Sequence, residues 1–233
     1  MKKTAIALLM ASLMCWTAGC SQTEQKSTSD SPVDNIVLTV GAEADQLKMA
    51  FSLDELYSDA DLVVKAKITE SYPTFHSDGS GRVFTHMIPE IITIYKGDYN
   101  NQELVTCGGI MELSKYSESG NAPIDDYTEG ELETGYVYYN WLNNYIPQED
   151  DEIIFFGKYS DQSDSFRNLY SYQGIYLCNE GNVTIKSLEY QPGDGWIEPL
   201  AHDLIDNFGA DIRYNDWTID VTCNEDSFTA AFQ

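Results

Sequence analysis

Alternating apolar and polar residues dominate the chain, and their period of two predicts β-strands. In "NIVLTV" (35–40) and in "LVVKAKI" (62–68) every second residue is apolar. This alternation places apolar side chains on one face of a strand and polar ones on the other. We therefore expect a sheet with one buried and one wet face.

Later runs add detail to this sheet. The run 82–95 is rich in β-branched residues, and Pro89 within it predicts a bulge or an edge position because proline has no backbone N–H. "DEIIFFGKY" (151–159) is apolar on both faces, which is typical of a central strand. "NEGN" (179–182) lies between two strand-like runs and predicts a hairpin turn.

Two segments have helical features instead. Ser52 and Glu55 form an S-x-x-E capping box at the start of a short helix. Pro199 suits a first helical turn, apolar residues recur at helical spacing after it, and Gly209 ends the pattern. Between them, the polar stretch 114–135 predicts a long loop.

The C-terminal residues predict a last hairpin, because apolar residues alternate on both sides of "NED" (224–226). The predicted fold class is therefore mainly β: an OB-like antiparallel barrel or sandwich with one short N-terminal helix, one C-terminal helix and a final β-hairpin. We expect one domain over residues 35–233, with its core at about 52–188 and a helix-plus-hairpin extension at 196–233.

The core segments "SDADLVVKAKITE", "ITIYKGDYNNQELVTCGG" and "DDEIIFFGKY" resemble a layout found in exported bacterial proteins. In that layout, a strand introduced by Ser-Asp, a strand ending in Lys-Gly and a later aromatic strand build an OB-like barrel similar to the netrin/metalloprotease-inhibitor module. The resemblance implies a fold and no function. That inhibitor family acts through a free N-terminal cysteine, whereas Cys20 here is expected to be acylated.

The first 20 residues resemble a bacterial lipoprotein signal. Lys2 and Lys3 precede an apolar run of about ten residues, too short to span a bilayer as a helix. Ala18, Gly19 and Cys20 match the lipobox, and Thr17 departs from its preferred leucine. The resemblance implies removal of residues 1–19, a diacylglyceryl group on Cys20 and retention at the extracytoplasmic face of the cell membrane.

Residues 20–34 are polar and predict a flexible tether. Once the signal is removed, three cysteines remain, Cys107, Cys178 and Cys223, so one internal disulfide at most can form, between partners that the sequence leaves open.

The charge balance excludes one class of partner. Thirteen Lys and Arg face 38 Asp and Glu, for a formal charge of −25. Nucleic-acid binding depends on cations that neutralise phosphates, so we expect no nucleic-acid partner. Spacings typical of metal ligands, nucleophile elbows or nucleotide loops do not occur, and we predict no catalytic residue, metal site or cofactor.

Aromatic residues are the candidate contact surface. Tyr139 and Trp141 lie in "YVYYNWLNNYI" and should share one strand face, and Trp196 stands beside "PGDG". Exposed Tyr and Trp stack on sugar rings or anchor protein partners. We therefore predict a membrane-anchored, non-catalytic module that binds a protein or a glycan of the cell envelope.

Two alternatives remain open. A cell-wall or glycan hydrolase would use scattered carboxylates, two of them about 5–10 Å apart in a cleft. A Ca²⁺-stabilised structural protein would use acidic runs such as "QEDDE" (148–152), although none of these runs has the spacing of an EF-hand loop.

Overall fold

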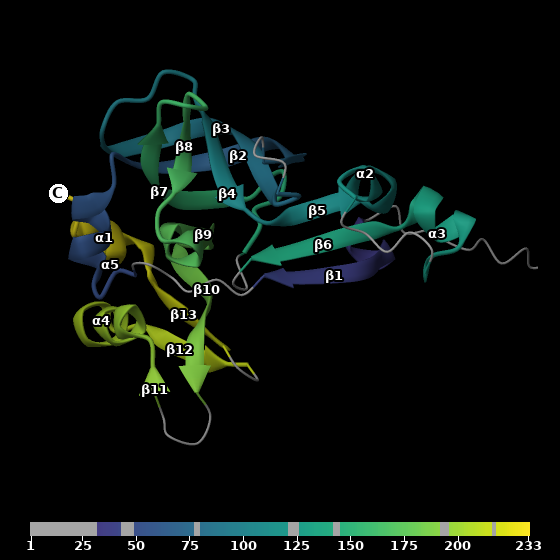
Figure 1. The fold of residues 1–233 in the computed structure, drawn as a ribbon. Helices are drawn as coiled ribbons and strands as arrows, with labels where there is room; N and C mark the ends of the chain where they lie inside the picture. The colour runs from purple at the N-terminus through teal and green to yellow at the C-terminus, as the bar shows by residue number, and fades with distance from the viewer. Residues whose placement is uncertain are drawn as a thin grey trace, which may run out of the picture. The chain divides into compact units, whose positions relative to one another are not determined.

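The computed structural model describes residues 32–42, 49–76, 80–120, 126–141, 145–191, 196–215 and 218–233 (Figure 1). Residues 31–233 form one compact unit. The predicted signal peptide, Cys20 and the tether up to residue 31 lie outside the described residues.

Strands make up most of the fold. Their bounds are β1 Ile36–Ala42, β2 Leu62–Phe75, β3 Val83–Lys96, β4 Glu103–Cys107, β5 Gly109–Glu112, β6 Tyr136–Trp141, β7 Glu152–Ser160, β8 Ser165–Asn168, β9 Ile175–Asn179, β10 Asn182–Gln191, β11 Trp196–Ile197, β12 Asp211–Tyr214 and β13 Thr218–Asn224. The helices are α1 Leu53–Asp59, α2 Leu113–Glu118, α3 Glu129–Thr134, α4 Pro199–Phe208 and α5 Glu225–Ala230, with 3-10 turns at Pro32–Asn35 and Ser171–Gly174.

Five strands close into a barrel, which confirms the predicted fold class. The strands pair in the order β2-β3-β4-β8-β7, and β7 pairs back to β2. All pairs are antiparallel except β4 with β8, which is parallel. Numbered along the chain, the barrel strands follow the order 1-2-3-5-4, as in OB-like Greek-key barrels.

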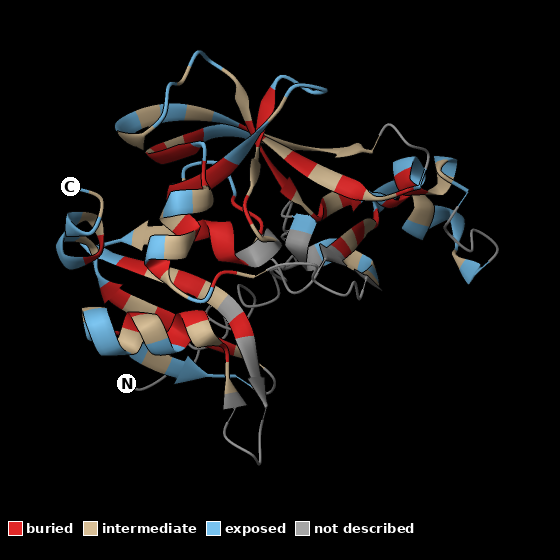
Figure 2. Cartoon of the chain, turned by 60° about the vertical axis from the view of Figure 1, so that its left-hand side comes forward, coloured by how far each residue is buried: buried red, intermediate tan, exposed pale blue. Residues whose placement is uncertain are grey.

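The barrel interior is apolar, and its central strand is the one the sequence indicates. Ile153–Gly157 of β7 are all buried, with β2 on one side and β8 and β9 on the other. Met87, Leu104 and Phe166 fill the same core from β3, β4 and β8. Figure 2 shows how buried positions alternate with more exposed ones along the strands.

The bulge expected near Pro89 is present. Pro89 pairs with Ile68 and Ile88 with Glu70, so Thr69 is an extra residue in β2. The pairing of β3 with β4 ends at Met87. Beyond it, Ile88–Lys96 pair with β2 on one side, and no strand among the described residues pairs with their other side. Pro89 therefore sits both at a bulge and on an edge.

A second layer continues from β7 through β9, β10, β13 and β12. The expected β9–β10 hairpin is formed, with Glu180 and Gly181 both at positive φ (50° and 76°), as its two-residue turn requires. Helices α1, α4 and α5 cover one side of this layer, and their apolar residues share a core with β10 and β13. The predicted cap of α4 is present, because Gly209 ends the helix at φ 63°. The capping box predicted for α1 forms only in half: Ser52 accepts from the Glu55 amide, but the Glu55 carboxylate accepts from the amide of Phe51 and not from that of Ser52.

The predicted loop at 114–135 is wrong in part, because α2 and α3 form there. Thr128 and Glu131 make a reciprocal capping box on α3, a T-x-x-E signal present in the sequence. These helices flank a separate sheet of β1, β6 and β5, in which β1 and β6 are parallel (Figure 1). Each helix has six residues, too few to show a helical period in the sequence.

The final hairpin is formed by β12 and β13, one element earlier than predicted, and the last segment is helix α5 instead of a strand. Asn224 accepts from the Ser227 amide and so caps α5, and Glu225 and Asp226 occupy its first turn. The prediction took Asn224-Glu225-Asp226 for a turn. Phe228 lies within α5, whereas Phe232 follows the end of the helix, and the two rings pack against each other with centroids 5.3 Å apart.

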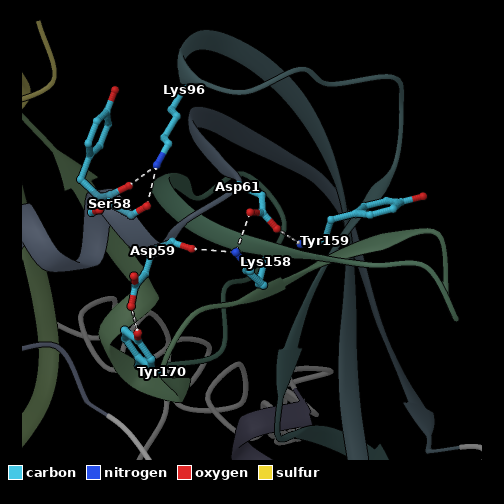
Figure 3. A network of polar contacts seen from close by, with 8 residues as sticks. Ser58, Asp59, Asp61, Lys96, Lys158, Tyr159 and Tyr170 are labelled. Carbon is cyan, nitrogen blue, oxygen red and sulfur yellow. Dashed lines mark hydrogen bonds and ion pairs between the residues drawn. The ribbon is translucent and has the colours of Figure 1, made fainter.

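Helix α1 is attached to the barrel through its C-terminal carbonyls (Figure 3). Lys96 of β3 donates to the carbonyls of Tyr57 and Ser58, at 2.6 and 2.9 Å. Lys158 of β7 donates to the carbonyl of Asp59, at 3.1 Å, and pairs with the Asp61 carboxylate at 2.6 Å. These carbonyls have no partner within the helix, and cations are favourable at this end of its dipole.

Candidate functional site

The sequence-predicted contact residues do not form one surface in the described structure. Tyr139 is only 6% exposed and packs in the core of the three-stranded sheet, so its ring offers almost no area to a partner. Trp141 ends β6 and Trp196 begins β11, and the side chains of both lie outside the described residues. Cys20 also lies outside them.

A different group of polar side chains comes together on the outside of the barrel. Tyr72 Oη donates to Glu103 Oε1 at 2.5 Å, and His86 Nδ1 lies 2.7 Å from Glu103 Oε2. The rings of Tyr72 and His86 stack, with centroids 5.4 Å apart. One carboxylate from β4 thus holds a phenol from β2 and an imidazole from β3.

Strand register places these residues side by side. Tyr72 pairs with His86, His86 with Val105, and Val105 with Arg167 of β8. Paired residues in a sheet point to the same face, and so do residues two apart in one strand. Glu103 is two residues before Val105 in β4 and therefore lies on this face as well. The neighbours Met87, Leu104 and Phe166 point into the barrel core, so this row faces outward.

Hydrogen bonding favours an ionised Glu103 and a protonated Tyr72. Burial alone would raise the pKa of Glu103, but hydrogen bonds from Tyr72 and His86 lower this pKa below its ordinary value. The bond to Glu103, together with burial and the negative charge, raises the pKa of Tyr72 to about 12. An ionised Glu103 only accepts hydrogen bonds, so His86 donates through Nδ1 and keeps Nε2 for another partner.

These residues line a pocket of about 370 Å³, which we call the β3–β4 pocket. Tyr72 and Phe84 are aromatic residues of its walls, and His76, which follows β2, lies against Phe84 with ring centroids 5.1 Å apart. Arg167 adds a positive charge, with its guanidinium carbon 5.5 Å from the Phe84 ring centroid. The pocket thus combines apolar walls with a few charged and polar groups, as ligand sites do.

The turn between β7 and β8 forms one wall of the pocket. Gln162 and Ser163 line the pocket from this turn. Ser163 Oγ donates to Ser160 Oγ at 3.0 Å and lies 2.8 Å from Ser165 Oγ, so hydrogen bonds tie the turn to both strands. Strands two and three of an OB barrel, with its 1–2 and 4–5 loops, are the surface on which such barrels bind oligosaccharides and oligonucleotides. Here β3 and β4 are those strands and residues 161–164 are the 4–5 loop.

The sequence held only part of this site. His86 is a polar residue in a strand, but nothing local shows that it meets Glu103, 17 positions away. The meeting follows from the register of three strands, and the β2–β3 bulges shift that register. The sequence offered one indirect signal for Arg167: arginine is rare in this acidic chain, which has only three.

Another pocket, of about 490 Å³, gathers acidic residues around Lys65. Lys65 Nζ lies 2.5 Å from Glu225 Oε1 and 3.6 Å from Glu152 Oε2. Because Lys65 is already held by two carboxylates of the chain, this arrangement fits a structural link between β2, β7 and α5.

The acidic run considered for Ca²⁺ is likewise engaged with the protein. Asp150 pairs with Lys67 at 2.7 Å, and Asp151 accepts from the Tyr145 hydroxyl and the Gln148 amide. Among the described residues, no group of three or more His, Cys, Asp or Glu side chains could hold a metal ion.

The three cysteines in the described part of the chain are free thiols, and burial raises the pKa of Cys107 and Cys178 to about 12 and of Cys223 to about 11. Cys178 and Cys223 both pair with Val183, from opposite sides of β10. Cys178 and Cys223 are therefore two strands apart, which places their Cα atoms about 9–10 Å from each other. A disulfide bridges Cα atoms up to roughly 7 Å apart, so these two cysteines cannot form one.

In the described part of the chain, no helix is both long and apolar enough to cross a membrane. No family model and no curated protein sequence matches this chain. The chemistry of the β3–β4 pocket therefore has to be inferred from its own residues and from the barrel that carries them.

Proposed function

We propose that the protein is a lipoprotein anchored through an acylated Cys20, and that its barrel is a non-catalytic module that binds glycans of the cell envelope. Membrane attachment is supported by the basic residues, short apolar run and Ala18-Gly19-Cys20 of the signal. The polar stretch from Cys20 to the 3-10 turn at Pro32–Asn35 serves as a tether between anchor and barrel.

The β3–β4 pocket carries the proposal of glycan binding. It lies on the strands and loop with which OB-like barrels bind oligosaccharides and oligonucleotides. A charge of −25 disfavours the oligonucleotides, because their phosphates need cationic neutralisation. Sugars suit what the pocket offers: flat rings for stacking, and Glu103 with His86 for hydroxyl groups.

Binding is favoured over glycan hydrolysis by the carboxylate content of the pocket. Glu103 is the single carboxylate among the described residues that line it, and both its oxygens already accept hydrogen bonds from the protein. Glycoside hydrolysis ordinarily uses two carboxyl groups that flank the bond to be cleaved.

A glycan array tests the proposal, with the full chain purified in detergent from membranes. We expect binding to envelope-type oligosaccharides that falls at least about tenfold in Glu103→Gln, which removes one charge-assisted acceptor. Glu149→Gln makes the same charge change at an exposed position and should bind like the wild type. Absence of binding to every glycan, or equal loss in both variants, would refute the glycan proposal.

A further inference from the structure

Among the described residues, Arg167 has no carboxylate partner, whereas four lysines do. Lys65, Lys67, Lys115 and Lys158 each pair with a carboxylate. Within the part of the chain that the structure describes, Arg167 makes no ion pair, and its Nε is shielded from solvent without a hydrogen-bond partner. Arg167 thus lines a pocket without a carboxylate partner among the described residues, and a carboxylate from a ligand could fill this place.

The position of Arg167 is set by the barrel. Its backbone pairs with Val105 of β4 and with Lys158 of β7, at the place where β8 closes the barrel. Its guanidinium lies over the Phe84 ring, which limits the side chain to few conformations. A guanidinium held against an aromatic face keeps its N–H edge available for a planar acceptor.

The pocket is therefore polarised, with Arg167 as its cation and Glu103 as its anion. The Glu103 side chain is 36% exposed and remains accessible to a donor from a ligand. A carboxylate from a ligand would be repelled by Glu103 and attracted by Arg167, which fixes the direction in which such a ligand binds.

We propose that the glycan bound in the β3–β4 pocket is an acidic sugar, whose carboxylate pairs with Arg167 while its hydroxyl groups donate to Glu103. This inference rests on the proposed glycan-binding function and specifies its ligand class. Arginine suits the role better than lysine, because its N–H groups match the two oxygens of a carboxylate.

The test compares each acidic sugar with its own methyl ester, which keeps the ring and removes the charge. The probes are glucuronate-, galacturonate- and N-acetylmuramate-containing oligosaccharides, with neutral and sulfated glycans on the same array. We expect at least one free acid to bind about 10- to 100-fold tighter than its ester, the range for a charge-assisted pair. Preference for the sulfated glycans over the carboxylates would overturn the assignment of a carboxylate.

Two variants assign the effect to Arg167. Arg167→Gln should bind acid and ester equally, and Arg167→Lys should recover only part of the preference. Arg213→Gln removes the same charge at an exposed position on β12 and should keep the full preference. Each variant is first shown to have a wild-type circular dichroism spectrum and melting temperature, so that a loss of preference cannot come from unfolding.

The failures of the two proposals can be told apart. If neutral glycans bind as tightly as acidic ones and Glu103→Gln weakens both, glycan binding stands and the acidic-sugar inference is wrong. If an acidic preference exists and persists in Arg167→Gln, its assignment to Arg167 is wrong. If no glycan binds at all, both proposals fall.

Discussion

Glu103 shows at the scale of one residue how the site and the stability of the barrel are linked. Its pKa lies below the ordinary value of 4.5, in spite of partial burial, because Tyr72 and His86 hydrogen-bond to the ionised form. A carboxyl group with a lowered folded pKa stabilises the protein fully above its unfolded pKa. This contribution is lost as the pH falls through the folded value.

Replacing Glu103 by Gln should therefore weaken the dependence of stability on pH below about 4.5. At pH 7 the cost should be only about 0.5–1 kcal/mol, because more than a third of the side chain is exposed and solvent screens it. Urea unfolding between pH 3 and 7 measures both. An unchanged acid slope in Glu103→Gln would show that Glu103 is not stabilised as described.

Gly97 makes a second residue-scale prediction. It has φ +81°, and an added Cβ would lie 2.1 Å from the carbonyl oxygen of Asp61, where α1 meets β2. Gly120 has a similar φ of +74°, but nothing lies within 4 Å of its added Cβ. Gly120→Ala should cost about 1 kcal/mol from backbone strain alone, and Gly97→Ala about 2–4 kcal/mol more. Equal midpoints of urea unfolding for the two variants would contradict the close contact.

At the scale of elements, the sequence predicted what depends on local patterns. A period of two identified β1 and β2, and a continuous apolar run identified β7. Capping residues identified α1 and α4, and Pro89 identified a bulge at an edge. The errors fell where one signal allows two structures. Phe228, Ala230 and Phe232 fit a strand by alternation. Asn224 nevertheless caps a helix at Glu225–Ala230, and Phe228 is buried in the core that includes residues of α4 and β13, which favours α5.

Helix α5 can be tested through Phe228, which is fully buried and packs against Tyr176 with ring centroids 4.8 Å apart. Phe228→Ala should lower the free energy of unfolding by about 3–5 kcal/mol, because it leaves a cavity in this core. Phe51→Ala removes the same ring at a position that is 61% exposed and should change stability by about 0.5 kcal/mol or less. A small effect of Phe228→Ala would mean that α5 does not pack as described.

The candidate site depends on how strands pair with one another, and the sequence pattern does not show this pairing. Tyr72, His86, Glu103 and Arg167 lie on four strands, and only the barrel register aligns them. The predicted aromatic contact at Tyr139 failed for a related reason. Alternation gives two faces of a strand, and the packing of the three-stranded sheet, not the pattern, decides which one is buried.

At the scale of the whole molecule, the anchor is a prediction about where the barrel works. Cleavage before Cys20 would remove Lys2 and Lys3 and change the formal charge from −25 to −27. An acidic barrel is repelled by anionic lipid headgroups, and a polar tether would hold it clear of them. The barrel would then bind a glycan ligand outside the membrane, at a distance from the lipid headgroups.

The anchor has a direct test. Intact-mass analysis of membrane-fraction protein should show the loss of residues 1–19 and a diacylglyceryl adduct on Cys20. Cys20→Ala should accumulate with its signal uncut, whereas Cys15→Ala should be processed like the wild type. Cleavage at another position, or normal processing of Cys20→Ala, would refute the lipobox assignment.

The most direct test of the central claim, that the β3–β4 pocket binds a glycan, is hydrogen–deuterium exchange with and without the tightest ligand from the array. We predict that protection concentrates in residues 72–76, 84–86, 103–105 and 162–167, which are far apart in sequence and adjoin in the pocket. Protection confined to other segments, such as β6 or the surroundings of Lys65, would contradict the claim, as would the absence of any glycan ligand.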